Sequence, residues 1–222
     1  MQGQDRRKQL LKVAVDVFAR QGFGGTKTRD IAAAAGVSEA ILFRHFASKE
    51  DLYHAILDAK ADQEGAPEFV ATLREFADKR DDVGLVRYIA SAILQSFRED
   101  PAFHRLILFA SLEGHLLAGL FRERFGLPVA AFLRRYIATR QKEGAFRKVD
   151  PQVAVMFLTG SIVHMAMVRY LFQCRKPNIV EETAGQEMAD MALAALVNSP
   201  REKGKIQKRK KSTVTKKMVR QA

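Results

Sequence analysis

Cysteine and proline are scarce in this 222-residue chain, which has one cysteine and six prolines. The single cysteine, Cys174, excludes an intramolecular disulfide framework and a cysteine-rich zinc site. Six prolines and 14 glycines are too few for a collagen-like or low-complexity chain. The first residues lead into an amphipathic segment instead of an apolar one, so we expect no secretory signal. The remaining composition, 47% hydrophobic and 28% charged, is ordinary for a soluble globular protein.

Strict alternation of apolar and polar residues is also missing. Apolar residues instead repeat at spacings of three and four, which predicts an all-α protein of about nine helices. Ser48 precedes Asp51 by three residues in a capping-box pattern, and Asp100 and Asp150 each precede a proline suited to the first helical position. The longer helices are expected at residues 4–21, 83–97, 101–116, 129–142, 151–172 and 180–197.

Acidic residues are few at the C-terminal end of the chain. The whole chain has 37 Lys and Arg against 25 Asp and Glu, a net charge of +12. Residues 201–222 hold ten basic residues and one acidic residue, whereas residues 55–200 hold 18 of each. This basic tail has almost no apolar residues to offset the entropy of ordering, so we expect it to be disordered. Its charge favours nucleic acid as a partner, with an anionic membrane second and a merely solubilising role as the plain alternative.

Long hydrophobic runs are few, and the strongest covers residues 153–172. Thr159, Ser161, His164 and Arg169 interrupt it. An ionisable residue near the centre of a lone membrane span costs roughly 2.5–3.5 kcal/mol. We therefore expect a helix that protein covers on most sides, for example at a subunit interface, and no membrane span.

Residues 26–52 read TKTRDIAAAAGVSEAILFRHFASKEDL and carry the strongest functional signal. They predict two short helices joined by a tight turn at Gly36, followed directly by a third capped helix, which is the pattern of a helix-turn-helix. The residues expected to face inward are Ile31, Ala32, Ala35, Leu42 and Phe46. The residues left facing outward are Ser38, Glu39, Ala40, Ile41, Phe43, Arg44 and His45. A helix of about seven residues fits the major groove of B-DNA.

At these positions the sequence resembles the TetR family of bacterial transcriptional regulators, whose pattern approximates T-x-x-x-I-A-x-x-A-G-V-S-x-G-T-L-Y-x-H-F-x-S-K-x-x-L. The matching residues are Thr28, Ile31, Ala32, Ala35, Gly36, Val37, Ser38, Leu42, His45, Phe46, Ser48, Lys49 and Leu52. The close match covers roughly residues 8–57, and the remaining chain agrees in kind. The resemblance implies a DNA-binding domain over residues 1–54 and a helical effector-binding and dimerisation domain over residues 55–200, followed by the basic tail, residues 201–222.

The resemblance also implies which residues contact DNA. Thr28 and Lys49 would contact phosphates at helix N-termini, where backbone amides favour anions. Arg44 and His45 would contact the DNA backbone or base edges, and residues 38–41 would face the floor of the groove. The full expected set is Lys27, Thr28, Arg29, Ser38, Glu39, Ala40, Ile41, Phe43, Arg44, His45 and Lys49.

Three residues depart from the family pattern, which often has Gly, Thr and Tyr where this chain has Ala40, Ile41 and Phe43. The family's tyrosine hydroxyl usually contacts a phosphate, and Phe43 lacks that hydroxyl. Ile41 cannot donate a hydrogen bond but can meet a thymine methyl group. Plainer interpretations stand beside these roles: ordinary packing for Ile41 and Phe43, a solvated charge for Lys49 and a surface histidine for His45.

Polar and aromatic residues scattered through the apolar segments are candidates for lining an effector cavity. Core packing is the competing interpretation for each of them, because Phe is an ordinary core residue. The candidates are Phe97, Phe103, Leu108, Ser111, His115, Phe132, Tyr136, Phe157, Ser161 and His164. The abundance of Phe fits an apolar small-molecule effector.

Patterns typical of catalysis or metal binding are absent. The five histidines show neither HExxH nor Cys-His spacing, and there is no Gly-x-Ser-x-Gly elbow. We therefore predict no catalytic residues, no metal and no cofactor. The prediction is a cytoplasmic, homodimeric repressor that binds palindromic operator DNA, dimerises through residues 150–198 and is released by a small molecule. The alternatives are an interaction protein whose tail docks on membranes or RNA, and an α-helical enzyme.

Overall fold

The computed structural model describes residues 3–61, 66–172 and 181–198, and every regular element within these ranges is helical. The helices are α1 (Gly3–Gly25), α2 (Thr28–Ala34), α3 (Glu39–His45), α4 (Lys49–Ala61), α5 (Ala66–Asp78), α6 (Asp82–Glu99), α7 (Pro101–Leu112), α8 (Leu116–Phe121), the π-helical turn η1 (Arg122–Gly126), α9 (Leu127–Lys142), α10 (Pro151–Tyr170) and α11 (Glu181–Leu196). The all-α prediction is confirmed. Cys174 and the basic tail lie outside the described residues.

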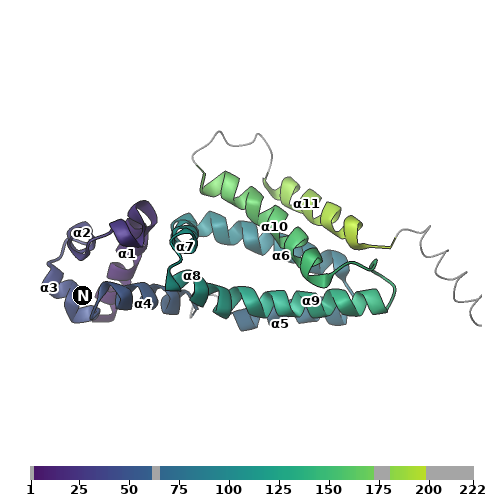
Figure 1. The fold of residues 1–222 in the computed structure, drawn as a ribbon, viewed down its shortest axis with the longest axis horizontal. Coiled ribbons are helices and arrows are strands. Elements are labelled where there is room, and N and C mark those ends of the chain that lie inside the picture. The colour runs from purple at the N-terminus through teal and green to yellow at the C-terminus, as the bar shows by residue number, and fades with distance from the viewer. Residues whose placement is uncertain (1–2, 62–65, 173–180, 199–222) are drawn as a thin grey trace, which may run out of the picture.

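Two apolar cores hold the chain together. One joins α1–α4 with α7 and α8, and the other joins α5, α6, α9, α10 and α11. Figure 1 shows the first core at one end of an elongated molecule and the second in the body, with α4 leading from one toward the other. The expected division between residues 54 and 55 falls inside α4. The helices α7 and α8 also lie beyond this division in the chain, yet they pack with α1–α4 in the first core.

Side-chain caps begin the helices at the expected positions. Asp100 Oδ1 accepts a hydrogen bond from the backbone N–H of Phe103 at 2.9 Å, and Asp150 caps α10 in the same way. Ser48 Oγ accepts a hydrogen bond from the backbone N–H of Asp51 at 2.9 Å. These starts follow from the sequence because a cap needs partners only two or three residues away.

The helix expected over residues 101–116 is divided in the structure. α7 ends at Leu112, and α8 begins after His115. Between them Gly114 adopts a φ of 66°, a left-handed conformation that glycine tolerates because it has no Cβ. Further along, the expected interruption near Gly126 is the π-helical turn η1. The described residues thus hold eleven α-helices and one π-helical turn, against the nine or so expected.

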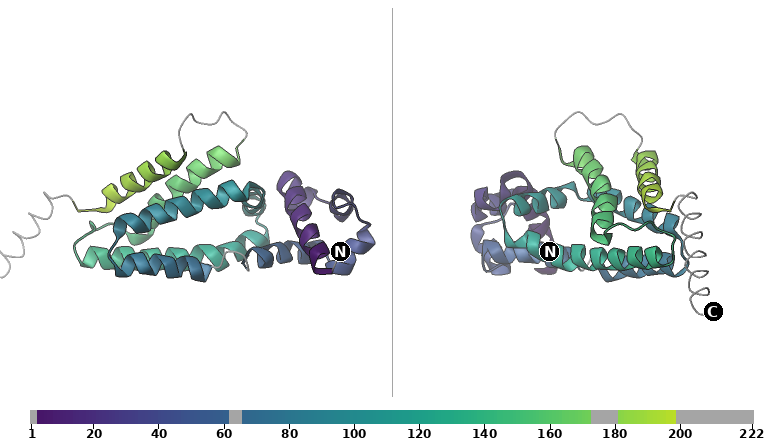
Figure 2. Two further views of the ribbon diagram at one scale, coloured as in Figure 1. Left: turned by 180° about the vertical axis from the view of Figure 1, so that it is seen from behind. Right: turned by 45° about the vertical axis from the view of Figure 1, so that its right-hand side comes forward.

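Among the described residues, α10 is the one helix long and apolar enough to cross a membrane by length and composition. Only 28% of its apolar window is buried within the chain, less than expected for a helix that protein covers on most sides. Val153, Met156 and Phe157 are 61%, 63% and 53% exposed. Figure 2 shows α10 and α11 side by side on one face of the body. This face therefore carries an uncovered apolar surface.

A polar network joins the start of α6 to α9. Arg140 donates to both carboxylate oxygens of Asp82, at 2.9 Å from Nε and 2.6 Å from Nη2. The Tyr136 hydroxyl donates to the same carboxylate at 2.5 Å. The Arg140 and Asp82 side chains are 13% and 16% exposed. Hydrogen bonding to Asp82 raises the pKa of Arg140, and burial raises the pKa of Tyr136. Bidentate hydrogen bonding between an arginine and a carboxylate is the strong form of an ion pair.

Candidate nucleic-acid interface

α2 and α3 form a helix-turn-helix whose inward residues are buried. The turn passes through Gly36, whose φ of 67° lies in the left-handed region that favours glycine. Ser38 begins α3, and its side chain accepts a hydrogen bond from the backbone N–H of Ile41. The buried side chains of this unit are Ile31, Ala32, Ala35, Leu42 and Phe46. This packing, expected from the sequence, holds α3 in a defined position on the N-terminal core.

The opposite face of α3 is open to solvent. Its exposed side chains are Ser38, Glu39, Ala40, Phe43 and Arg44. Phe43 is 46% exposed, although large aromatic residues are usually buried, and Ile41 and His45 are half-buried. Figure 1 places α3 at the tip of the molecule, away from the body. An exposed seven-residue helix at a tip has the size and position needed to enter a DNA major groove.

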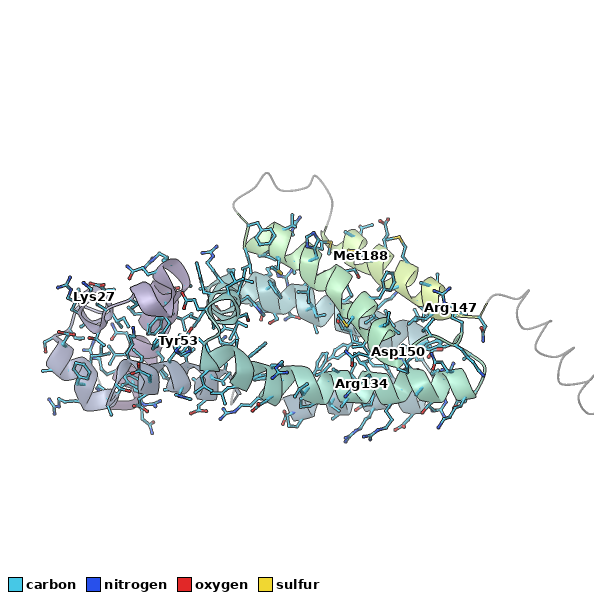
Figure 3. All side chains as sticks on the ribbon, in the orientation of Figure 1. Lys27, Tyr53, Arg134, Arg147, Asp150 and Met188 are labelled. Carbon is cyan, nitrogen blue, oxygen red and sulfur yellow. The ribbon has the colours of Figure 1, made fainter. Side chains whose placement is uncertain are left out.

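Side chains at the start of α2 reach the same surface. Lys27 and Arg29 are exposed, and Figure 3 shows Lys27 near the outer end of the molecule. The Thr28 hydroxyl donates to a carboxylate oxygen of Glu39 at 2.5 Å, which ties α2 to α3. A phosphate contact from Thr28, as the resemblance implies, would therefore have to replace this hydrogen bond.

Lys49 lies at the start of α4 and is half-buried. Its ammonium donates to the carbonyl oxygens of Phe23 at 2.8 Å and Thr26 at 3.1 Å, and it lies 4.0 Å from the centroid of the Phe23 ring. Lys49 is therefore less solvated than a free surface charge would be, and the phosphate contact that the resemblance implies stays a prediction. In this placement Lys49 closes the loop between α1 and α2, which fixes where α2 begins.

The turn between α7 and α8 contacts the same loop. The centroid of the His115 ring lies 4.0 Å from that of Phe23 and 4.7 Å from that of Tyr53. Figure 3 shows Tyr53 between the N-terminal helices and the body. Burial raises the pKa of Tyr53 and lowers the pKa of His115. The end of α1, where Lys49 binds the Phe23 carbonyl, is therefore also in contact with the turn between α7 and α8.

The ten residues expected to line an effector cavity do not surround a single cavity. The body core and its margin contain Phe97, Leu108, Phe132 and Tyr136. Solvent reaches Ser111, Phe157 and His164. The Ser161 hydroxyl donates back to the Phe157 carbonyl within α10 at 3.1 Å. Helical spacing indicates which side of a helix is apolar but not which helices meet. The sequence therefore could not show that these residues lie apart.

A cavity of about 310 Å³ lies between the end of α4, the α6–α7 junction and the α8–η1 segment. Its lining residues are Lys60, Ser96, Glu99, Asp100, Phe103, His104, Phe121 and Phe125. Of the ten expected residues, Phe103 alone lines it. The sequence indicated Asp100 as a helix cap, but no spacing signal related it to Lys60, 40 positions away. Within the described ranges, no group of three or more His, Cys, Asp or Glu is arranged to hold a metal ion.

Comparisons with known proteins agree with this geometry. Residues 10–56 match the family described as "Bacterial regulatory proteins, tetR family". The HTH-type transcriptional regulator RutR of Escherichia coli K12 is 29% identical over 164 residues, which cover 72% of this chain and 74% of RutR. The HTH-type transcriptional activator FasR of Mycolicibacterium smegmatis is 34% identical over 104 residues, which cover 46% of this chain and 45% of FasR.

A solved structure shares the fold over most of the chain. It is AibR, in complex with isovaleryl coenzyme A and operator DNA, with a TM-score of 0.61 and 22% identity over 84% of this chain and 97% of AibR. The matched segment, residues 10–56, spans the end of the structure where α3 presents its exposed face. Both relatives are named as regulators of transcription. Residues 10–56 thus carry the N-terminal segment of the tetR family of bacterial regulatory proteins, and over 72% of its length the chain is similar to an HTH-type transcriptional regulator.

Proposed function

We propose that this regulator is a repressor that binds a palindromic operator as a homodimer and leaves it when a small molecule binds. The exposed face of α3, held by a buried inner face, is the observation that carries the proposal. AibR was solved with operator DNA and an acyl coenzyme A, which supports a DNA-and-effector mechanism with an apolar ligand group. FasR is named an activator, so the sign of regulation is a separate question for transcription assays.

The uncovered apolar surface on α10 supports dimerisation through residues 150–198. Val153, Met156 and Phe157 follow one another at spacings of three and one on α10, and Met191 on α11 is 63% exposed. Gly160 is exposed and has open space where a Cβ would stand, so a partner helix can approach closely there. In such a dimer, two recognition helices about 34–36 Å apart would enter successive major grooves on one face of the duplex.

Effector release would follow from linkage between two sites. A ligand that binds more tightly when the two α3 helices are spaced differently weakens DNA binding. The factor equals the one by which DNA weakens binding of the ligand. α4 supports this coupling, because Lys60 at its end lines the cavity and Lys49 at its start holds the loop before α2. We assign residues 1–54 to DNA binding, 55–200 to effector binding and dimerisation, and 201–222 to a basic tail. A regulator of this kind acts on DNA in the cytoplasm.

Selection of bound sequences from random double-stranded DNA tests the proposal. We expect a pseudo-palindrome whose half-sites are one helical turn apart, because two symmetry-related α3 helices would read it. Size measurement of the complex should give two chains per site. Recovery of a single unrepeated site, or of no preferred sequence, would contradict dimeric readout.

Ile41→Ala should relax the preference at one base pair in each half-site. Ile41 is half-buried on the outward part of α3, and a good base contact is worth roughly 1–3 kcal/mol. Affinities for operators varied at each position would measure the effect. Val83→Ala, an exposed apolar position at the start of α6, is the control. Equal weakening on specific and random DNA would argue against base readout by Ile41.

Lys49→Ala should weaken binding by a similar factor on all DNA sequences. The substitution removes two charge-assisted hydrogen bonds that position the start of α2, each worth roughly 1.5–3 kcal/mol. The melting temperature should fall as well, which a lost phosphate contact alone would not cause. Lys79→Ala, an exposed lysine after α5, is the matched control. A loss confined to the specific operator would contradict this role.

Removal of residues 201–222 should reduce affinity and flatten its salt dependence without abolishing operator recognition. The tail carries ten basic residues, and each phosphate contact contributes to the slope of affinity against salt concentration. Titrations at several salt concentrations on operator and random DNA would measure both effects. Complete loss of operator binding would instead favour a protein that acts through its tail on polyanions.

A further inference from the structure

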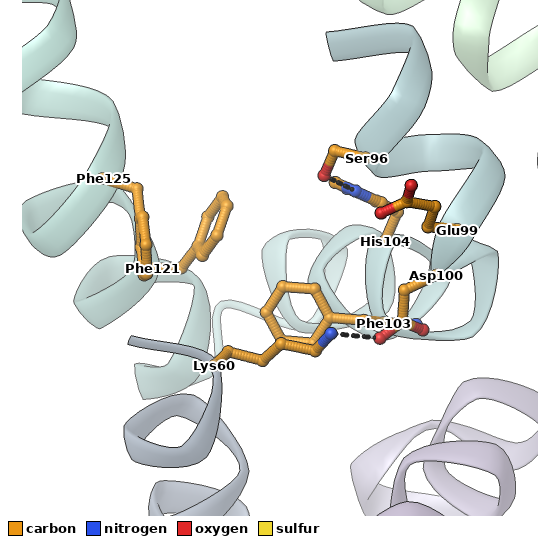
Figure 4. Close-up of a pocket in the computed structure, with 8 residues that line it drawn as sticks. All are labelled: Lys60, Ser96, Glu99, Asp100, Phe103, His104, Phe121 and Phe125. Carbon is orange, nitrogen blue, oxygen red and sulfur yellow. Dashed lines mark hydrogen bonds and ion pairs between the residues drawn. The ribbon is translucent and has the colours of Figure 1, made fainter. Parts of the chain in front are cut away.

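The cavity between α4, the α6–α7 junction and the α8–η1 segment has an aromatic wall. Phe103, Phe121 and Phe125 come from three different elements and meet there (Figure 4). The ring centroids of Phe103 and Phe121 are 5.6 Å apart in an edge-to-face arrangement, and those of Phe121 and Phe125 are 5.0 Å apart and stacked. Aromatic faces carry partial negative charge and attract both flat apolar groups and cations.

The opposite wall is polar and has more acidic than basic groups. Lys60 Nζ lies 2.5 Å from Asp100 Oδ2, so this lysine is already paired. The other oxygen of Asp100 caps α7. Glu99 adds a second carboxylate, which accepts a hydrogen bond from the neutral side-chain amide of Gln95 at 2.8 Å. The lining residues therefore hold one ammonium against two carboxylates.

His104 adds no positive charge to this wall at neutral pH. Its ring is stacked on Phe97 with centroids 3.8 Å apart, and its Nε2 lies 2.8 Å from the Ser96 hydroxyl. Burial lowers the pKa of His104 to about 4, although the nearby Asp100 opposes this effect. A neutral imidazole beside a serine hydroxyl can accept or donate a hydrogen bond without repelling a cation.

We propose that this cavity binds a small organic cation with a flat apolar or aromatic body. The proposal rests on the proposed function, because it names the chemical class of the effector. The body would lie against Phe121 and Phe125, and the cationic group would bind Glu99 and Asp100 in place of Lys60. A volume of about 310 Å³ matches the lower end of small-molecule sites, which suits a ligand of one or two rings.

Binding of this kind would release the end of α4. Lys60 lies in the last turn of α4, and Asp100 lies between the end of α6 and the start of α7, so their ion pair holds the end of α4 against the α6–α7 junction. A second ion pair joins Asp58 of α4 to Arg124 of η1 at 2.5 Å. A cation on Asp100 displaces Lys60 by like-charge repulsion. An anionic ligand would break the same ion pair by binding Lys60 instead of Asp100.

Three probes of one shape and different charge test the proposal: phenethylammonium, 2-phenylethanol and 3-phenylpropanoate. Calorimetric titration of the full-length protein should show the cation binding at least about tenfold more tightly than the other two, the difference expected for one charge-assisted hydrogen bond. Tighter binding of the carboxylate, equal binding of all three, or no binding of any would overturn the proposal.

Substitutions separate the roles of the two charges. Glu99→Gln and Asp100→Asn should each weaken phenethylammonium binding about tenfold, and asparagine keeps the cap of α7. Lys60→Met should strengthen cation binding, because it removes the competing ammonium. An anion site predicts loss of binding in Lys60→Met instead. Glu75→Gln, on the exposed face of α5, is the control for loss of a surface carboxylate.

The two proposals fail in distinguishable ways. Operator binding is measured without any probe, so a protein that selects an operator but ignores phenethylammonium overturns the cation site alone. A protein that binds the cation at Glu99 and Asp100 but selects no operator overturns the regulatory function and leaves the cation site in place.

Discussion

Replacing Phe157 by glutamate should leave a folded monomer that no longer binds operator DNA tightly. Phe157 is 53% exposed in the single chain, so the substitution removes little of the chain's own core. In the proposed dimer the new carboxylates would be buried without partners, at a cost of about 3 kcal/mol or more. We expect operator affinity to fall by about 100-fold or more, because a monomer presents one α3 instead of two. Sedimentation and operator titration would measure both effects.

Leu112→Glu is the matched control for the dimer prediction. Leu112 is 76% exposed at the end of α7, outside α10 and α11. It should therefore accept a carboxylate without loss of the dimer or of operator binding. A Phe157→Glu protein that stays dimeric at micromolar concentration would rule out an interface centred on α10.

Asp82→Ala should lower the free energy of unfolding by about 3 kcal/mol. Removal of one partner from a buried ion pair leaves an uncompensated charge, which typically costs about 3–5 kcal/mol. The lower end applies here because Arg140 keeps a second partner, Glu143, at 2.6 Å. Tyr136 also loses the acceptor of its hydroxyl. Urea unfolding monitored by far-ultraviolet circular dichroism would measure the change in this helical protein.

An exposed ion pair on the same helix provides the comparison. Arg87 of α6 lies 2.7 Å from Asp190 of α11, and both side chains are 48% exposed. Water and salt screen such pairs, so Arg87→Ala should cost less than about 1 kcal/mol. If the two substitutions cost the same, burial of the Asp82–Arg140 pair does not govern its contribution to stability.

The helix-turn-helix was the part of the site that could be predicted in most detail. Gly36, Ser38 and Leu42 act through neighbours within a few positions, so their order and spacing indicate the turn, the cap and the buried anchor. Lys49 shows the limit of this reasoning. Its motif position suggested a phosphate contact. In the structure its ammonium donates to the carbonyl oxygens of Phe23 and Thr26, which precede it by 26 and 23 positions.

The candidate effector site could not be predicted in the same way. Several of the aromatic candidates lie in the apolar cores, but in different ones. Phe132 and Tyr136 belong to the core of the body, and Phe103 belongs to the N-terminal core. The cavity arises where Lys60, Asp100 and Phe125 meet from three elements. The periodicity of a single helix does not predict contacts between residues of different helices.

The order of amino acids by itself determined the helices, most of their starts and stops, and the outward residues of α3. These features depend on caps, turns and helical periodicity, which act over three or four residues. Only the tertiary structure decided that α7 and α8 pack with the N-terminal helices, that α10 keeps an apolar side uncovered, and that a charged cavity forms beside α4. Those outcomes depend on which apolar faces pair across long stretches of chain, and many pairings satisfy the same hydrophobic pattern.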